Sequence, residues 1–305
     1  MPNQCDVLIT GGYFCDMIFT GLNQMPCIGT DVFCNEFDMV PGGCYYSALA
    51  LHRLGLNTAW LCDIGNDIFS KYILDQAKQQ NLNVSNFRHY DEPRRFIASS
   101  LSFQEDRSIV SFCDKPYRMP SEKEIINLQP RLVLLPGVDC CLHINDYQTA
   151  KKQFGSIIVM DCQHTQLTMS DDGVVDALKC VDVFIPNEKE ATEFTGETDV
   201  FRALDRLSEI IPAVIIKRGS KGAIARQGNE LIEVPAIKVE VKDTTGAGDN
   251  FNAGAIYAIL NNLELELVLR FGNIVGGLSV TTTGAPSLRS VDEITIVAKG
   301  YPSYC

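Results

Sequence analysis

Short runs of β-branched and apolar residues alternate with stretches of helical spacing along most of this chain, which limits the folds open to it. The runs predict strands at residues 7–10, 58–63, 132–135, 156–160, 181–185 and 213–217. The stretches around them predict helices that include residues 44–54, 69–80, 188–194, 200–211 and 251–260. Repeated βαβ units of this kind give an α/β fold with a mostly parallel sheet covered by helices. In such sheets, ligands bind beyond the carboxyl ends of the strands.

Two segments interrupt this alternation. Residues 13–40 contain Gly, Asn and Pro without a long helical stretch, and residues 94–113 read as two strands around a turn at Glu105-Asp106-Arg107. We expect the two segments to form a small β lid over the edge of the main sheet. Because no repeat, low-complexity segment or linker divides the chain, lid and sheet are predicted to form one domain spanning residues 1–305.

The composition argues against several classes of partner. The net charge is −12 and the pI is about 4.8, whereas proteins that bind nucleic acid concentrate Lys and Arg. No apolar run reaches the length of a membrane-spanning helix. The first residues lack the basic start and apolar core of a signal peptide. The twelve cysteines include no Cys-x-x-Cys, and most have apolar neighbours, which predicts reduced thiols in a cytoplasmic protein.

The most specific segment is Asp243-Thr244-Thr245-Gly246-Ala247-Gly248-Asp249-Asn250-Phe251, which follows a strand-like stretch at 237–241 and opens a helical one. Its Gly-Ala-Gly leaves backbone N–H groups uncovered at a helix start. Such a start carries a charge of about +0.5 and attracts phosphate. Asp249 brings a carboxylate to the same place, which suits a base that removes a proton from a substrate hydroxyl. The alternative is a Gly-rich turn in which Asp249 is a helix N-cap.

Four further segments complete an ordered set. They are a Gly-Gly segment at 41–50, Gly-x-Asp-x-Phe within 63–69, Asn-x-x-Glu within 186–191 and Gly-x-x-Gly within 217–222. Together with Asp-Thr-Thr-Gly-Ala-Gly-Asp-x-Phe-x-Ala-Gly, they resemble the motifs of the ribokinase-like (PfkB-type) carbohydrate kinases. One departure is Ser70, which replaces the usual glycine after Phe69. The resemblance covers nearly the whole chain and implies a three-layer α/β/α fold with a mostly parallel central sheet and a small β lid.

The resemblance implies an ATP-dependent phosphotransferase that moves the γ-phosphoryl group to a hydroxyl. By position, Asp249 is the general base, and its amide completes an anion hole formed by Gly246, Ala247 and Gly248. Asn187 and Glu190 are implied to organise Mg²⁺ through its waters. The same spacing also permits a helix capping box between these two residues, and both roles can coexist.

The implied ATP site draws on several segments: Asn187, Lys217, Gly219, Gly222, Asn273 and Gly284. The family also implies a monovalent cation such as K⁺ beside the anion hole, held by Asp243 and the Thr245 carbonyl. The residues after Ala285 depart from the ribokinase pattern, so an ordinary loop remains open as an interpretation there.

On the substrate side, the resemblance places Asp16 where its carboxylate accepts hydrogen bonds from sugar hydroxyls. Gly42 and Gly43 would let the backbone approach the sugar closely. Between residues 1 and 70 the only Lys or Arg is Arg53. A phosphorylated sugar needs such cations at its phosphate, so a small uncharged sugar is expected.

Several alternatives remain open. The lid arginines Arg94, Arg95 and Arg107 either contact an anion or are ordinary charges on the lid surface. Contact with an anion would favour a sugar acid such as 2-keto-3-deoxygluconate as the substrate. Aromatic residues near the lid either pack it or stack on the base of a nucleoside substrate. A different class is a non-catalytic sugar- or nucleotide-binding regulator on the same fold, although an intact Asp249 and anion hole speak against it. The family also implies a homodimer formed through the lid.

Overall fold

The computed structural model describes residues 4–103, 107–163, 165–281 and 291–299. The chain forms two compact units. Unit 1 contains Met1–Thr10, Ser47–Trp60 and Met119–Cys305, and unit 2 contains Gly11–Tyr46 and Leu61–Arg118. Neither unit is a continuous stretch of sequence, because the chain passes from one to the other four times.

In the part of the chain that the structure describes, unit 1 is built on an eight-stranded sheet with the order β14-β13-β12-β11-β10-β9-β1-β4. Its strands are β1 (Val7–Thr10), β4 (Thr58–Leu61), β9 (Leu132–Leu135), β10 (Ile157–Asp161), β11 (Val183–Ile185), β12 (Ala213–Lys217), β13 (Ala223–Gln227) and β14 (Glu230–Val234). Strands β1, β9, β10, β11 and β12 pair in parallel, and β13 and β14 add antiparallel pairs at one edge. The predicted α/β class with a mostly parallel sheet is confirmed.

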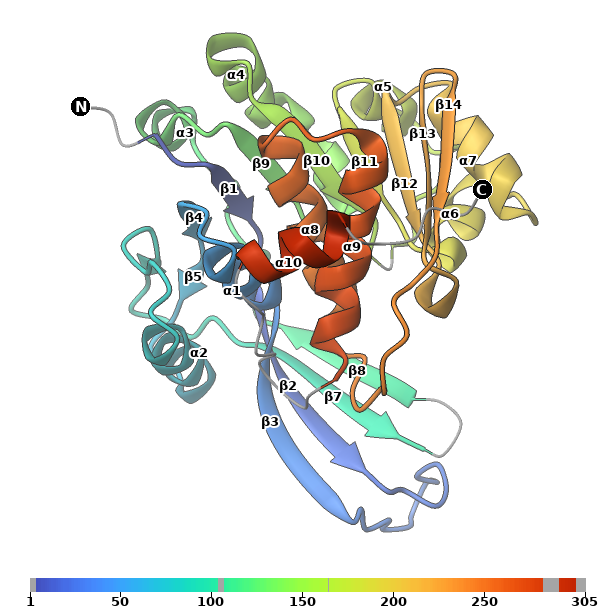
Figure 1. Ribbon diagram of the computed structural model, residues 1–305. Helices are drawn as coiled ribbons and strands as arrows, with labels where there is room; N and C mark the ends of the chain where they lie inside the picture. The colour runs from blue at the N-terminus through green and yellow to red at the C-terminus, as the bar shows by residue number, and fades with distance from the viewer. Residues whose placement is uncertain (1–3, 104–106, 164, 282–290, 300–305) are drawn as a thin grey trace. The chain divides into compact units, whose positions relative to one another are not determined.

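Helices accompany the sheet along the chain. They are α1 (Cys44–Arg53), α3 (Glu122–Leu128), α4 (Ile144–Phe154), α5 (Val174–Leu178), α6 (Glu188–Thr195), α7 (Val200–Ser208), α8 (Ala247–Leu260), α9 (Leu265–Ser279) and α10 (Val291–Lys299), with short 3₁₀ turns η1 (Val138–His143) and η2 (Gly219–Lys221). Helices α8, α9 and α10 lie on one side of the sheet, and α6 and α7 lie on the other (Figure 1). Unit 1 therefore has three layers.

The central strands are buried on both faces. Every residue of β1 (Val-Leu-Ile-Thr) and of β9 (Leu-Val-Leu-Leu) is buried. Strands of parallel sheets are apolar throughout because helices cover both faces. This explains why these runs lack the alternation of polar and apolar residues that a half-exposed strand would show.

Helices α8 and α9 approach each other through glycines. A Cβ added to Gly254 on α8 would lie 2.5 Å from the carbonyl oxygen of Phe271 on α9. A Cβ added to Gly272 would lie 2.7 Å from the ring of Phe251. Close packing of this kind leaves little room for either helix to shift. The contact therefore fixes the position of α8, whose first turn carries Asp249.

Among its described residues, unit 2 contains a four-stranded sheet with the order β3-β2-β7-β8. Its elements are β2 (Tyr13–Thr20), β3 (Glu36–Gly43), β7 (Phe96–Ser102) and β8 (Arg107–Cys113), together with the short strands β5 (Asp63–Ile64) and β6 (Arg88–His89) and helix α2 (Ile68–Gln79). The segments expected to form a lid supply most of the four-stranded sheet. That this sheet acts as a lid stays a prediction.

Helix α2 is anchored by the segment that resembles Gly-x-Asp-x-Phe. The Asp67 carboxylate accepts hydrogen bonds from the Ser70 amide at 3.0 Å and from the Arg94 amide at 2.9 Å. The buried Ser70 hydroxyl shares hydrogen bonds of 2.8 Å with the Tyr13 hydroxyl and the Gly65 amide. The serine that departs from the family pattern thus joins α2 to the start of β2.

One predicted strand is wrong. Residues 237–241 are irregular rather than extended, and Val241 is 60% exposed. The sheet ends at β14, and residues 237–241 do not pair with the open edge of that strand. Pro235 follows β14 directly and lacks the N–H group that would continue a ladder.

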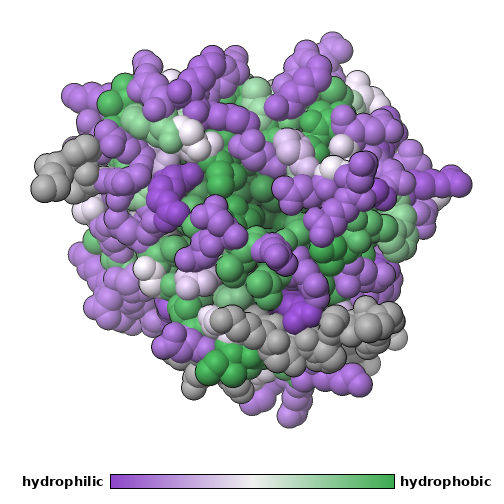
Figure 2. Space-filling view, turned by 45° about the horizontal axis from the view of Figure 1, so that its top comes forward, coloured by the Kyte–Doolittle hydropathy of each residue, from purple (hydrophilic) through white to green (hydrophobic). Residues whose placement is uncertain are grey.

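Most of the surface is polar on the face shown in Figure 2, where hydrophobic residues gather toward the centre. No described helix is both long enough and apolar enough to cross a bilayer. The described cysteines are all free thiols, and Cys5, Cys15, Cys44, Cys62, Cys140 and Cys162 are buried.

Candidate active site

Three neighbouring parallel strands of unit 1 end beside polar residues. Strand β10 ends at Asp161, β12 ends at Lys217, and Asn187 follows β11 at the start of α6. Because β10, β11 and β12 are neighbours, these residues lie at one edge of the sheet. Parallel α/β sheets bind their ligands at this edge.

The first turn of α8 has the geometry of an anion site. The helix begins at Ala247, and Asp249 is its third residue. The N-cap is Gly246, which has a φ of 71°, so the helix start has no hydrogen bond from an N-cap side chain. The Ala247 N–H donates to the Thr244 carbonyl at 3.2 Å, whereas among the described residues the N–H groups of Gly246 and Gly248 have no acceptor. The anion hole itself stays a prediction that this geometry supports.

Lys217 forms a ring of hydrogen bonds with two other side chains. Its ammonium donates to Oδ1 of Asp161 at 2.9 Å and to Oδ1 of Asn252 at 3.3 Å. Asn252 closes the ring by donating to Oδ2 of Asp161 at 2.7 Å. A Cβ added to Gly248 would lie 3.5 Å from Lys217 Nζ. The ammonium therefore lies beside the first turn of α8, and two sources of positive potential meet there.

The ammonium of Lys217 is stabilised in its charged form. Burial acts to lower its pKa, but the negative charge of Asp161, followed by that of Glu190, outweighs burial and raises the pKa above its ordinary value. Lys217 consequently carries its full positive charge at neutral pH.

The carboxylate of Asp249 is more basic than an ordinary aspartate. Burial, with a further contribution from the charge of Asp161, raises its pKa to about 6. A hydrogen bond of 2.6 Å from the Ser47 hydroxyl to Oδ1 and the charge of Lys217 act in the opposite direction. At neutral pH the group is mostly ionised, yet it binds a proton more strongly than a solvated carboxylate does.

Asn187 and Glu190 form the capping box that their spacing permits. Asn187 Oδ1 accepts from the Glu190 amide at 2.8 Å, and Glu190 Oε2 accepts from the Asn187 amide at 2.8 Å. Burial first, and then the charge of Asp161, raise the pKa of Glu190. Among the described residues, no three His, Cys, Asp or Glu side chains are grouped so that they could hold a metal directly. A magnesium ion held through waters and phosphates is compatible with this donor set.

Among the other residues predicted to bind the nucleotide, Gly219 and Gly222 belong to a tight turn, whereas Asn273 already has hydrogen-bond partners in unit 1. Gly219 and Gly222 have φ values of +56° and +97°, and a Cβ on Gly222 would lie 2.0 Å from the Val234 carbonyl oxygen. Asn273 is buried, and its amide nitrogen donates to the same carbonyl at 3.1 Å. That nitrogen is thus already used to attach α9 to the end of β14. Gly284 lies outside the described residues.

The residues proposed to hold a monovalent cation lie close together. Oδ1 of Asp243 accepts a hydrogen bond of 2.9 Å from the Thr245 amide. The Asp243 amide donates to the Val280 carbonyl at 3.3 Å, which ties the turn to the end of α9. The cation itself stays a prediction.

Asp16, Gly42 and Gly43 lie in unit 2. Asp16 on β2 and Gly42 on β3 are so close that a Cβ on Gly42 would lie 2.2 Å from Asp16 Oδ2. Gly43 has a φ of +60°, and a Cβ there would lie 2.9 Å from the Gly12 carbonyl oxygen. Gly43 is therefore required by the local backbone, whereas the absence of a side chain at Gly42 leaves room for the Asp16 carboxylate.

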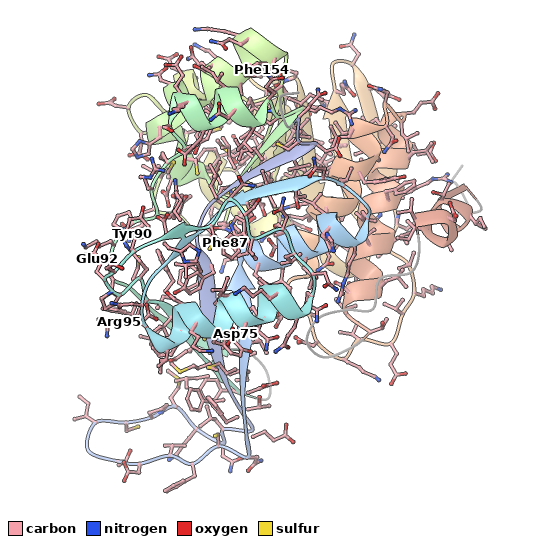
Figure 3. All side chains as sticks on the ribbon, turned by 90° about the vertical axis from the view of Figure 1, so that its left-hand side faces the viewer. Asp75, Phe87, Tyr90, Glu92, Arg95 and Phe154 are labelled. Carbon is pink, nitrogen blue, oxygen red and sulfur yellow. The ribbon has the colours of Figure 1, made fainter. Side chains whose placement is uncertain are left out.

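The arginines considered as anion contacts have partners within unit 2. Arg95 makes a two-point ion pair with Asp114 at 2.9 and 2.8 Å, and Arg94 pairs with Glu92 at 2.8 Å. Glu92 and Arg95 can be followed on the segment that joins β6 to β7 (Figure 3). The side chain of Arg107 lies outside the described structure, although its backbone pairs with Ser102. The guanidinium groups of Arg94 and Arg95 thus have carboxylate partners, and Glu92 is shared with Lys115.

Aromatic residues of unit 2 divide between core and surface. Tyr13, Tyr45 and Phe96 are buried, as expected for residues that pack the unit. Phe33 and Phe37 are 87% and 56% exposed. Only the exposed pair therefore presents ring surface among these five.

Sequence reasoning missed three members of the cluster: Ser47, Asp161 and Asn252. Asp161 ends a buried strand two strands away from Lys217, and this position was a usable signal. Asn252 follows Asp249 by three residues on α8, so the two share a helix face. Nothing local marks Ser47, because its partner is 202 residues away.

Comparisons with known proteins identify the family and the fold of this chain. A family model described as pfkB family carbohydrate kinase matches residues 19–290. The ribokinase of Lactococcus lactis is 27% identical over 293 residues, which cover 92% of this chain and 92% of the ribokinase. The 2-dehydro-3-deoxygluconokinase of Bacillus subtilis is 27% identical over 258 residues, which cover 78% and 79% of the two chains.

A solved structure shows the same fold. Arabidopsis thaliana ribokinase complexed with ribose and ATP matches with a TM-score of 0.79 and 21% identity, covering 97% of this chain and 99% of that one. The three-layer ribokinase-like fold is thereby confirmed. Since the family model extends over most of the 305 residues, the chain belongs to the pfkB family of carbohydrate kinases and is an enzyme that transfers phosphoryl groups.

Proposed function

We propose that this kinase transfers the γ-phosphoryl group of ATP to a hydroxyl of a small uncharged sugar. The observation that carries the proposal is the juxtaposition of three groups in unit 1. A carboxylate of raised basicity (Asp249) lies in the first turn of a helix with uncovered N–H groups, and a buried ammonium (Lys217) lies beside that turn. Phosphoryl transfer needs a proton acceptor and positive potential at one place.

In the proposed step, Asp249 accepts the proton of the sugar hydroxyl while that oxygen forms a bond to the γ-phosphorus. The bond between the γ-phosphorus and the bridging oxygen breaks, and its electron pair leaves with ADP. The backbone N–H groups of Gly246, Ala247, Gly248 and Asp249 stabilise the charge that develops on the phosphoryl oxygens. Lys217 supplies a full positive charge to the same region.

The charge balance of the cluster supports a requirement for Mg²⁺. Three carboxylates, from Asp161, Glu190 and Asp249, face a single ammonium, from Lys217. A nucleotide triphosphate would add further negative charge, which a divalent cation offsets when it is bound. Glu190 uses Oε2 in the capping box, which leaves Oε1, with the Asn187 side chain, to hold the waters of the ion.

The remaining nucleotide and cation roles are extensions of the same proposal. Gly219 and Gly222 shape the turn beside which adenine lies, and Asn273 supports that wall; Gly284, also predicted to bind the nucleotide, lies outside the described residues. Asp243 and the Thr245 carbonyl hold a monovalent cation such as K⁺ next to the first turn of α8.

For the sugar, we propose that Asp16 accepts hydrogen bonds from two hydroxyls, while Gly42 and Gly43 allow close approach of the backbone. The ion pairs of Arg94 and Arg95 favour an uncharged sugar over the acid acted on by the Bacillus subtilis relative. We also propose a homodimer through the sheet of unit 2, because β8 at its edge exposes Ile109, Val110 and Phe112.

The test is an ATP-consumption assay over a panel of D-ribose, D-fructose, 2-keto-3-deoxygluconate and inosine. We expect turnover with a neutral sugar and a loss of about 10²–10⁴-fold in kcat for Asp249→Asn. Turnover of only the sugar acid or only inosine would contradict the proposal of a neutral sugar substrate. It would remain consistent with the proposed phosphoryl transfer.

Two other results would contradict the proposed mechanism. Near-normal activity of Asp249→Asn would remove the base assignment. Binding of a sugar without any ATP turnover over the whole panel would favour a non-catalytic regulator.

A further inference from the structure

Ser47 makes the shortest polar contact of the proposed base. Its hydroxyl donates to Oδ1 of Asp249 at 2.6 Å, and the serine is only 5% exposed. The donor comes from α1 and the acceptor from the first turn of α8, so the contact joins two helices that are distant in sequence. No other described side chain donates a hydrogen bond to this carboxylate.

The contact distinguishes the two oxygens of Asp249. A carboxylate on the first turn of a helix rotates about two side-chain bonds, and a charge-assisted hydrogen bond from a buried donor selects one rotamer. Oδ1 then accepts a hydrogen bond from a side chain, whereas no described side chain donates to Oδ2, so Oδ2 binds a proton with less competition. A misplacement of a reacting group by about 1 Å can cost about 10²-fold in rate, so this selection matters for catalysis.

The same contact acts on the protonation state of the base. Burial and the charge of Asp161 on β10 favour the protonated acid, whereas the Ser47 hydroxyl and the charge of Lys217 on β12 favour the carboxylate. Lys217 is shared with Asp161 and Glu190, so its effect on Asp249 is partly offset. The Ser47 hydroxyl, in contrast, acts on Asp249 directly, because it donates its hydrogen bond to that carboxylate.

Resting on the proposed role of Asp249 as the base, we propose that Ser47 is a positioning residue that holds Oδ1 and thereby assigns proton acceptance to Oδ2. Ser47 itself touches neither substrate nor nucleotide in this role. Its loss should therefore change how well the base works and at which pH, and leave the binding of ATP unchanged.

The experiment compares Ser47→Ala, Ser47→Thr and a control, Ser156→Ala. Ser156 is 2% exposed and donates to the Ala150 carbonyl at 3.0 Å at the opposite end of β10, so its removal also deletes a buried hydroxyl. In Ser47→Ala, the acid limb of kcat/KM should move upward by about one pH unit. The kcat above the limb should fall about tenfold to a hundredfold, with an unchanged KM for ATP.

Ser47→Thr retains the hydroxyl and should restore both properties, and Ser156→Ala should leave the acid limb in place. A second measurement needs no substrate: the ¹³C signal of the Asp249 carboxyl, assigned by its loss in Asp249→Asn, should titrate about one unit higher in Ser47→Ala.

The outcomes separate the two proposals. An unshifted carboxyl titration and acid limb in folded Ser47→Ala, together with an inactive Asp249→Asn, would overturn the role of Ser47 and leave the base assignment intact. An active Asp249→Asn would overturn the base assignment itself.

Discussion

At the scale of single residues, the raised pKa of Asp249 would favour its proposed role as a base and has a cost to the fold. Its pKa of about 6 arises first from burial, which penalises the carboxylate. A stronger base accepts a proton from a hydroxyl more readily, provided that the operating pH keeps it ionised. Both the activity and the stability of the enzyme should therefore depend on this one titration.

The first prediction concerns activity. Below a pH of about 6, kcat/KM should fall about tenfold per unit, because the protonated form of Asp249 cannot accept the substrate proton. Initial rates at low substrate concentration across pH 4.5–8.5 would measure it. An ordinary solvated aspartate would give a limb near pH 4, and that result would contradict the burial effect.

The second prediction concerns stability. The folded pKa of about 6 exceeds the ordinary value of 3.8, so the folded chain binds this proton more tightly than the unfolded chain does. The ionised carboxylate consequently destabilises the fold above pH 6, and the penalty disappears as the pH falls through 6 towards 4. Asp249→Asn should raise the free energy of unfolding at pH 8 by on the order of 1 kcal/mol.

Chemical denaturation at pH 8 and at pH 4.5 would measure this gain. The variant retains an oxygen that can accept the hydrogen bond from Ser47, so the comparison isolates the charge. An equal gain at both pH values would show that something other than the ionised carboxylate is responsible.

At the scale of elements, the pairing of β2 with β3 determines where the Asp16 carboxylate lies. A methyl group on Gly42 would occupy the position of Oδ2, at 2.2 Å. Gly42→Ala should displace this carboxylate and raise the KM for the sugar about tenfold or more, with an unchanged KM for ATP. Steady-state kinetics with each substrate varied in turn would measure this separation.

Gly12→Ala is the matched control for that variant. The nearest atoms to a Cβ on Gly12 would belong to the Phe96 ring, at ordinary contact distances of 3.4–3.7 Å. If both variants raised the KM for the sugar equally, a general loosening of unit 2 would explain the effect, and the role of Asp16 would lose its support.

In helix α6, the residues proposed to hold the waters of Mg²⁺ also form a structural motif. The Asn-x-x-Glu sequence predicts a capping box, and the structure forms it through Asn187 Oδ1 and Glu190 Oε2. The local spacing determines those two contacts. It does not determine that α6 starts beside Asp161 and Lys217, because this follows from the order of β10, β11 and β12 in the sheet.

At the scale of the whole molecule, the sequence predicted the α/β class, most strands and the position of Asp249 at a helix start. These features depend on local patterns of apolar residues and glycines. The ring of Asp161, Lys217 and Asn252 and the contact of Ser47 with Asp249 join residues that are far apart in the chain. The strand expected at 237–241 failed because pairing depends on a neighbour that local composition does not reveal.

Binding of the nucleotide to the folded chain should depend on Mg²⁺. A non-hydrolysable ATP analogue at a hundred times its Kd should stabilise the folded chain by about 2.7 kcal/mol when Mg²⁺ is present. With EDTA the gain should largely vanish, because the phosphates then face the carboxylates of Asp161, Glu190 and Asp249 without a divalent cation. Thermal unfolding with and without the metal would measure the difference.

Glu190→Gln serves as the control for the metal. Glutamine at this position still closes a capping box, so α6 should remain intact. The variant should lose much of the Mg²⁺-dependent gain while its stability without nucleotide stays close to that of the parent. A full gain in Glu190→Gln would show that Glu190 does not hold the ion.

The division of the chain into two discontinuous units has an evolutionary consequence. The residues proposed to activate the hydroxyl and hold the phosphates belong to unit 1, whereas Asp16, Gly42 and Gly43 belong to unit 2. Mutations that accumulate in residues 11–46 and 61–118 can therefore alter which sugar is accepted without altering Asp249, Lys217 or Asp161. A lineage that keeps the first set and varies the second could acquire new substrates by small steps while its chemistry is inherited unchanged.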